Sequence, residues 1–188
     1  MMKRFAFLVV SVSVLVLVAG GFFYWWQTQA DVRALNKTLP EGVRVVKSLL
    51  GNEYGVINKI DGYEFKIPME WKGVKMTEYK PEEVEKNRTA SSIYLEGKEG
   101  SGSIVSIDAY KKNKSDVSIE EWAKFLFSDY GLSGEFKKEQ VGEYNVLSVQ
   151  EEQHLASAYI YFLNYSKIYV LTSRFDEFIR YIIANGKW

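Results

Sequence analysis

Residues 167–184, KIYVLTSRFDEFIRYIIA, combine an apolar strand pattern with an amphipathic helix pattern that follows it directly. The strand, Lys167–Thr172, is apolar on both faces, which is typical of a central strand covered on both sides. In the helix, Phe175–Ala184, five apolar residues recur at the i, i+3, i+4, i+7 and i+8 spacing of one face. The stretch therefore predicts a sheet with a helix packed against it.

A second helix is predicted at Ile119–Tyr130. Ser118 and Glu121 match a capping box, in which each side chain accepts a hydrogen bond from the other residue's backbone N–H. Gly131 provides the stop signal at the other end. The apolar residues of this segment recur at helical spacing: Ile119, Trp122, Ala123 and Leu126.

Short β-like segments fill most of the remaining chain. Tyr63, Phe65 and Ile67 alternate with polar residues, so they lie on one face of a strand, and Pro68 ends it. The order of elements predicts an α+β domain, a largely antiparallel sheet covered by two helices at about 118–130 and 175–185. The other predicted strands are Val43–Leu49, Tyr54–Ile60, Ile93–Leu95, Ile104–Tyr110, Glu135–Val141, Asn145–Gln153 and Ala156–Asn164.

Ahead of this domain, Phe5 to Trp26 form 22 consecutive uncharged positions behind Lys3-Arg4. At about 1.5 Å per residue they reach about 33 Å, enough for a hydrocarbon core of about 30 Å. The basic pair predicts a cytoplasmic N-terminus, and Tyr24-Trp25-Trp26 suit the far interface. We therefore predict a single-pass anchor in the cell membrane, with the chain from Gln27 onward outside the cytoplasm.

The alternative is a cleaved signal peptide, which would leave a secreted protein. Signal peptides have a shorter apolar run of about 7–15 residues, and the candidate cleavage site Thr28-Gln29-Ala30 has a threonine where a small residue is preferred. The predicted organisation is thus a cytoplasmic N-terminus (1–4), an anchor (5–26), a polar juxtamembrane stalk (27–42) and an extracytoplasmic α+β domain (43–188).

The charge of the exported part is almost balanced, with 22 basic against 24 acidic residues, and it has no basic block. We therefore expect neither nucleic-acid binding nor electrostatic attraction to anionic lipid. The chain has no cysteine, so the stability of the domain must come from packing.

Several segments together resemble the PsbP-like domain family. They are Gly62–Trp71 (GYEFKIPMEW), the strand Ile104–Tyr110 running into the helix Val117–Tyr130, and the hairpin Tyr159–Thr172 followed by the last helix. The resemblance covers about residues 60–188. It implies an antiparallel sheet sandwiched by helices, and a protein that assists or binds other proteins without catalysis. The anchor departs from photosynthetic members, so no metal, chloride or photosystem contact is carried over.

Nothing in the sequence predicts an enzyme, a cofactor or a metal site. His154, the single histidine, lies at a predicted turn between strands, where an exposed residue is expected rather than a general base. No Gly-x-Ser-x-Gly elbow, phosphate loop or dinucleotide-binding turn occurs. The acidic residues of 82–85 are typical of a solvated helical turn behind Pro81, and those of 120–121 of a helix's first turn.

The aromatic surplus is the remaining signal, because tyrosine and tryptophan are frequent anchors of protein interfaces. The alternative is that these residues form cross-strand pairs on a sheet face. We predict a non-catalytic, membrane-tethered module that binds an envelope protein. The candidate interface residues are Trp71, Tyr79, Tyr94, Tyr110 and Tyr165.

Two other functions are consistent with the sequence. One is a binding module for a small apolar ligand between the sheet and the C-terminal helix. The other is an envelope hydrolase that uses acidic residues, which requires two carboxylates facing each other across a cleft. The residues that would line the apolar pocket are Trp122, Phe162, Phe178 and Ile182.

Overall fold

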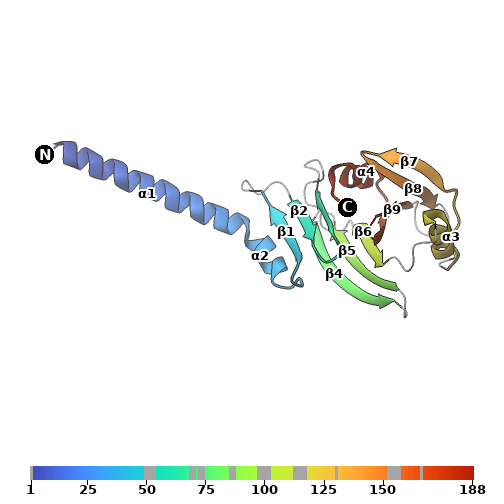
Figure 1. The fold of residues 1–188 in the computed structure, drawn as a ribbon. Helices are drawn as coiled ribbons and strands as arrows, with labels where there is room; N and C mark the ends of the chain where they lie inside the picture. The colour runs from blue at the N-terminus through green and yellow to red at the C-terminus, as the bar shows by residue number, and fades with distance from the viewer. Residues whose placement is uncertain are drawn as a thin grey trace.

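The computed structural model describes residues 2–48, 54–67, 71, 75–84, 88–96, 103–111, 118–129, 131–151, 158–165 and 167–188. Within these residues the chain forms two antiparallel sheets and four helices (Figure 1), so the predicted α+β class is confirmed. The first helix projects from the body as a rod, and the remaining elements pack together.

The smaller sheet has the strand order β1-β2-β3, with β1 at Val43–Lys47, β2 at Tyr54–Asn58 and β3 at Tyr63–Lys66. Helix α2, Ala30–Asn36, lies along the open edge of β1. There the Asn36 side-chain amide donates to the Val45 carbonyl at 2.9 Å and accepts from the Val45 N–H at 2.8 Å. The side chain thus replaces a missing neighbouring strand, which satisfies backbone groups that an edge leaves unpaired.

The larger sheet has seven strands in the order β4-β5-β6-β10-β9-β8-β7. β10 lies between β6 and β9, in the interior of the sheet, as its two apolar faces predict. The strands are β4 (Lys75–Val84), β5 (Arg88–Glu96), β6 (Ser103–Lys111), β7 (Lys137–Val141), β8 (Tyr144–Glu151), β9 (Ala158–Asn164) and β10 (Lys167–Ser173).

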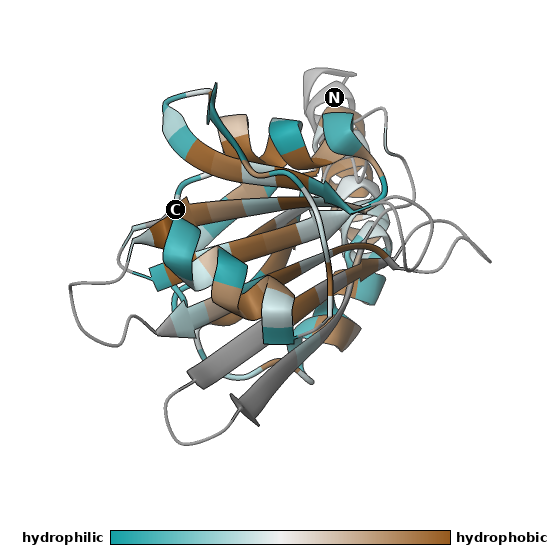
Figure 2. Ribbon diagram, turned by 90° about the vertical axis from the view of Figure 1, so that its right-hand side faces the viewer, coloured by the Kyte–Doolittle hydropathy of each residue, from teal (hydrophilic) through white to brown (hydrophobic). Residues whose placement is uncertain are grey.

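Both faces of the large sheet are covered. Alternate residues of β10 belong to two core clusters, Tyr169 and Leu171 on one side and Ile168 and Val170 on the other. The first cluster includes helix α4, Asp176–Asn185, together with the small sheet, and the second includes helix α3, Ile119–Asp129. Figure 2 shows hydrophobic residues along the strands and on the helix sides that face them.

The prediction of one sheet covered by two helices was therefore inexact. The first three predicted strands form a sheet of their own, which shares one face of the large sheet with α4. Period-2 alternation shows that a strand buries one face, but it does not show which surface that face packs against. Here Tyr63 of β3 contacts Tyr169 of β10 directly, with 5.7 Å between ring centroids, and the Trp188 ring packs against both, at 5.3 Å from Tyr63 and 5.4 Å from Tyr169.

The capping box predicted for α3 is confirmed. The Glu121 N–H donates to the Ser118 hydroxyl at 3.2 Å, and the Ser118 N–H donates to the Glu121 carboxylate at 3.1 Å. Helix α4 begins at Asp176 with Phe175 at its N-cap position, one residue later than the apolar pattern indicates.

Helix α1, Met2–Thr28, contains a segment, Val9–Thr28, that is long and apolar enough to cross a membrane. It is the one such helix in the part of the chain that the structure describes. The segment 27–42, predicted as a polar stalk, packs against the small sheet. Val32 is buried there, and the Gln29 side-chain amide donates to the Ser48 carbonyl at 3.1 Å.

Candidate functional site

A polar hollow of about 600 Å³ lies between α4 and the end of the large sheet that β7, β8 and β9 form. We refer to it as the polar hollow. It lies at the end of the domain away from α1 (Figure 1). Its lining includes three basic and three acidic residues, so it has no net charge. The lining residues are Ser133, Gly134, Glu135, Lys137, Lys138, Glu139, Ser148, Val149, Gln150, Tyr159, Tyr161, Asp176 and Arg180.

Strand alternation explains why polar residues gather there. Positions two apart on a strand point to the same face. Lys137 and Glu139 on β7 therefore share a face with Val141, which is buried in the core cluster on the α4 side. The same alternation brings further polar side chains to this face from the neighbouring strands: Ser148 and Gln150 from β8, and Tyr159 and Tyr161 from β9.

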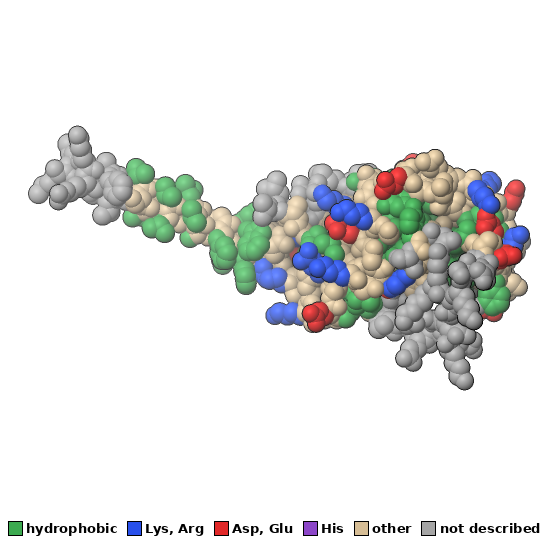
Figure 3. Space-filling view, in the orientation of Figure 1, with side chains coloured by type: hydrophobic (Ala, Val, Ile, Leu, Met, Phe, Trp, Pro, Cys, Tyr) green, Lys and Arg blue, Asp and Glu red, His purple; other side chains and the backbone are tan. Residues whose placement is uncertain are grey.

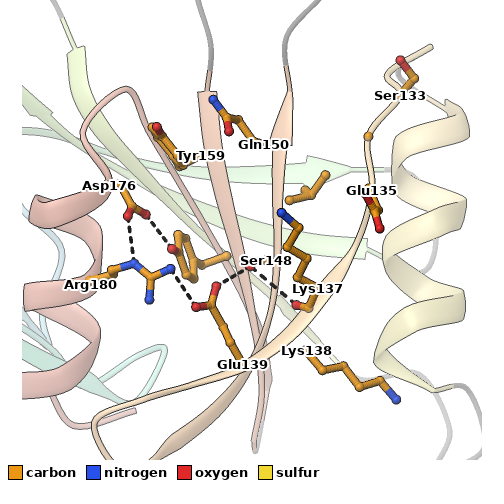
Figure 4. Close-up of a pocket in the computed structure, with 13 residues that line it drawn as sticks. Ser133, Glu135, Lys137, Lys138, Glu139, Ser148, Gln150, Tyr159, Asp176 and Arg180 are labelled. Atoms are coloured by element: carbon orange, nitrogen blue, oxygen red, sulfur yellow. Dashed lines mark hydrogen bonds and ion pairs between the residues drawn. The ribbon is translucent and has the colours of Figure 1, made fainter.

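Arg180 is the centre of a hydrogen-bonded network in the floor of the polar hollow (Figure 4). Its Nε donates to Asp176 at 2.8 Å, an i,i+4 pair on α4, and its Nη2 donates to Glu139 on β7 at 2.7 Å. The Tyr161 hydroxyl donates to the other oxygen of Asp176 at 2.6 Å. The Ser148 hydroxyl donates to Glu139. The network thus links α4 to three strands.

The electrostatics of this network keep its donors protonated. Burial and the hydrogen bond to Asp176 raise the pKa of Tyr161 far above its usual value. Burial opposes the charge of Arg180, but the hydrogen bonds that it donates to Glu139 and Asp176 outweigh this effect and raise the pKa of the guanidinium.

Four polar side chains around the polar hollow have no hydrogen bond or ion pair among the residues that the structure describes. They are Glu135, Lys137, Gln150 and Tyr159. Lys138, in contrast, points away from Arg180 (Figure 4) and pairs with Glu120 on α3. The site therefore combines a fixed floor with free donors and acceptors around it, and it suits a polar ligand.

The predicted interface residues do not form one patch where their side chains are described. The Trp71 ring packs against the rings of Phe175 and Phe178, with 4.9 Å between the ring centroids in each pair. Tyr79 is half-buried against the same core cluster. Tyr110 lies in the opposite cluster.

The Tyr110 side chain was expected to be exposed, but it is only 8% exposed and packs against Trp122. Tyr165 is 39% exposed and packs against Tyr144. The side chain of Tyr94 and the whole of His154 lie outside the described residues. A contact between any of these residues and a partner protein stays a prediction.

Two further expectations about side chains need correction. The residues 82–84 belong to strand β4 and not to a helical turn. Pro81 is tolerated there because β4 is an edge strand of the large sheet. The residues proposed for an apolar pocket lie on opposite faces of the sheet: Trp122 and Phe162 pack in the α3 cluster, and Phe178 and Ile182 in the α4 cluster.

Four residues of this network were not predicted from the sequence: Glu139, Ser148, Tyr161 and Arg180. A local signal existed only for Arg180, because Asp176 and Arg180 are spaced i,i+4 for an ion pair beside the apolar stripe of α4. No group of acidic residues, histidines or cysteines suited to a metal ion occurs in the described part of the chain.

No protein-family model, curated protein or solved structure matches this chain. The PsbP-like resemblance thus stays a prediction from the order of elements.

Proposed function

We propose that the chain is a non-catalytic, membrane-tethered module of the cell envelope that binds another protein in the polar hollow. The observation that supports this most is the polar hollow itself, a ready-formed cavity with a fixed Arg180 floor at the end of the domain farthest from α1. Its volume of about 600 Å³ is in the range of ligand pockets in proteins, about 300–1,000 Å³.

Preorganisation favours binding at this site. The ion pairs with Asp176 and Glu139 already restrict the rotamers of Arg180. Binding of a ligand to Arg180 therefore costs little further side-chain entropy. The free side chains of Lys137 and Tyr159 would supply hydrogen bonds that the folded domain leaves unmade. A polar segment of a partner protein fits this lining better than an apolar molecule does.

The tether would strengthen such an interaction. A domain held on α1 moves in two dimensions with other membrane proteins, so its effective concentration for a tethered partner is high even when the intrinsic affinity is modest. This argument favours a partner in the same membrane or close to it.

Site-specific photocrosslinking in intact cells tests the proposal. A photoreactive amino acid replaces Gln150, whose side chain is exposed in the polar hollow, and in a matched control it replaces Lys124, which is exposed on α3. We expect one reproducible partner from position 150 and not from 124. We also expect Lys137→Ala with Tyr159→Phe to abolish this adduct.

Two results would contradict the proposal. One is the recovery of only the protein itself from position 150. The other is an adduct that forms equally well in the K137A/Y159F variant, because the free side chains of the polar hollow would then contribute nothing to binding.

A further inference from the structure

The part of the domain next to α1 carries a surplus of unpaired positive charge. In the described residues 29–48 and 54–67, Asp31 is paired with Lys47, and Asp61 with Lys167 of the large sheet. Two acids, Glu41 and Glu64, remain there without an ion pair. The basic residues without an ion pair are Arg33, Lys37, Arg44, Lys59 and Lys66.

The positions of these residues relative to α1 follow from direct contacts. The Arg33 Nη2 donates to the Trp26 carbonyl at 2.6 Å, and its guanidinium carbon lies 3.7 Å from the centroid of the Trp26 ring. Arg33 is thus held at the level of the aromatic residues that end the apolar segment. Lys37 follows it by four residues, at the C-cap of α2, and is exposed.

The outer face of the small sheet begins beside the C-terminal end of α1. Gln29, the first residue after α1, bonds to the Ser48 carbonyl, so the β1–β2 end of the sheet lies beside the end of α1. In this end row Val46, Gly55 and Lys66 are neighbours on three strands. A Cβ at Gly55 would lie 3.0 Å from a Val46 methyl carbon and 3.9 Å from the Lys66 Cγ, which places both side chains on one face.

That face combines apolar and basic side chains. The next outward-facing row along the sheet contains Arg44, Ile57 and Glu64. Val46 is 39% exposed although it is apolar. Figure 3 shows the Lys and Arg side chains around hydrophobic ones at the end of the body next to α1. We refer to the surface formed by Arg44, Val46, Ile57, Glu64 and Lys66, together with Lys37 at the end of α2, as the basic face, because its three basic residues outnumber its one acid.

We infer that the basic face contacts anionic lipid headgroups of the membrane that α1 crosses. This inference needs α1 to span the membrane but is independent of the partner proposed for the polar hollow. Basic side chains near an anionic membrane surface each gain favourable free energy, provided they lie within a Debye length of about 8 Å. The near-neutral charge of the exported part gave no sign of this surface, because most of the compensating acidic residues lie outside residues 29–48 and 54–67.

Headgroup contact would also fix the orientation of the domain. A lone span leaves the domain free to rotate, whereas the basic face on the lipid surface would hold it on one side. The exposed Val46 and the partly exposed Ile57 would then reach the interfacial region, where apolar side chains are stabilised.

Lysine footprinting of the full-length protein in lipid nanodiscs tests the inference. We would compare discs of neutral phosphatidylcholine with discs containing about one-third phosphatidylglycerol, and measure amine acetylation by mass spectrometry. We expect Lys37 and Lys66 to react about fivefold more slowly in the anionic discs. Half-molar salt should remove this protection, and Lys124 on α3 should react equally in both.

A charge-matched pair of variants separates headgroup contact from general electrostatics. Arg44→Gln with Lys66→Gln should remove the protection of Lys37, whereas Lys124→Gln with Lys138→Gln, at the far end, should leave it intact. Equal acetylation of Lys37 and Lys66 in neutral and anionic discs would overturn the inference. So would an equal loss of protection in both double variants. Neither result would affect the photocrosslinking test of the polar hollow.

Discussion

The turn between β7 and β8 gives a direct test of how closely α4 packs on the large sheet. Gly142 has a φ of +62°, and a Cβ built on it would lie 2.9 Å from the Ala184 Cα and 3.2 Å from the Ala184 carbonyl oxygen. Gly142→Ala thus incurs two costs, a left-handed backbone and a collision with helix backbone that has little freedom to move.

The magnitude follows from adding the two costs. An L-residue in the left-handed region costs about 1–2 kcal/mol, and overpacking against a buried neighbour costs about 1–3 kcal/mol. We expect Gly142→Ala to lower the free energy of unfolding by about 2–5 kcal/mol. The substitution also pushes β7 away from α4, so it should weaken the ion pair between Arg180 and Glu139.

Gly131 provides the matched control. Its φ is +64°, nearly that of Gly142, but a Cβ added to it would have no atom within 4 Å among the described residues other than its chain neighbours. Gly131→Ala should therefore show the backbone cost alone. The assay is urea unfolding of the full-length protein in detergent micelles, followed by tryptophan fluorescence. If Gly142→Ala cost no more than Gly131→Ala, the close approach of the turn to α4 would be wrong.

Three further predictions use the same assay. Phe178→Ala, at a fully buried position of α4, should cost about 3–5 kcal/mol, whereas Phe125→Ala, 54% exposed on α3, should cost less than about 1 kcal/mol. Lys167→Met should cost about 2–3 kcal/mol, because it removes the ammonium group that pairs with a nearly buried Asp61; a change below about 0.5 kcal/mol would contradict this. The raised pKa of Tyr161 means that the folded state retains a proton that the unfolded chain loses above about pH 10. The contribution of Tyr161 to the free energy of unfolding should therefore be constant below that pH and fall above it. Above about pH 10 the free energy of unfolding of Tyr161→Phe should decline less steeply than that of the parent protein, and an equally steep decline would contradict this.

Both amphipathic helices of the domain were predictable from the sequence because their signals are local. The apolar stripe of α4 and the Ser118–Glu121 capping box of α3 involve residues within one or two helical turns. The central position of β10 was also predictable, since only a strand covered on both faces is apolar at successive positions. The apolar run of α1 was recognised on the same basis, by its length and composition.

The candidate site was not predictable in the same way. Glu139, Tyr161 and Arg180 are far apart in sequence, and each looks like an ordinary surface residue of its own element. Only the pairing of β7 with β8 and β9, and the position of α4 across them, brings these side chains together. Residue type also does not tell which face of a sheet a side chain occupies, and the burial of Tyr110 in the α3 cluster was not predicted for this reason.

Short-range periodicity and capping encode the anchor-like helix, the α+β class, both helices of the domain and the central strand, so these were predictable from local patterns. The folded domain was needed to show that the first three strands form a separate sheet, that Arg180 has two carboxylate partners, and that unpaired basic residues gather beside α1. These features depend on which surfaces pack together and on which charges become neighbours. Both are long-range consequences of burial that a local pattern does not carry.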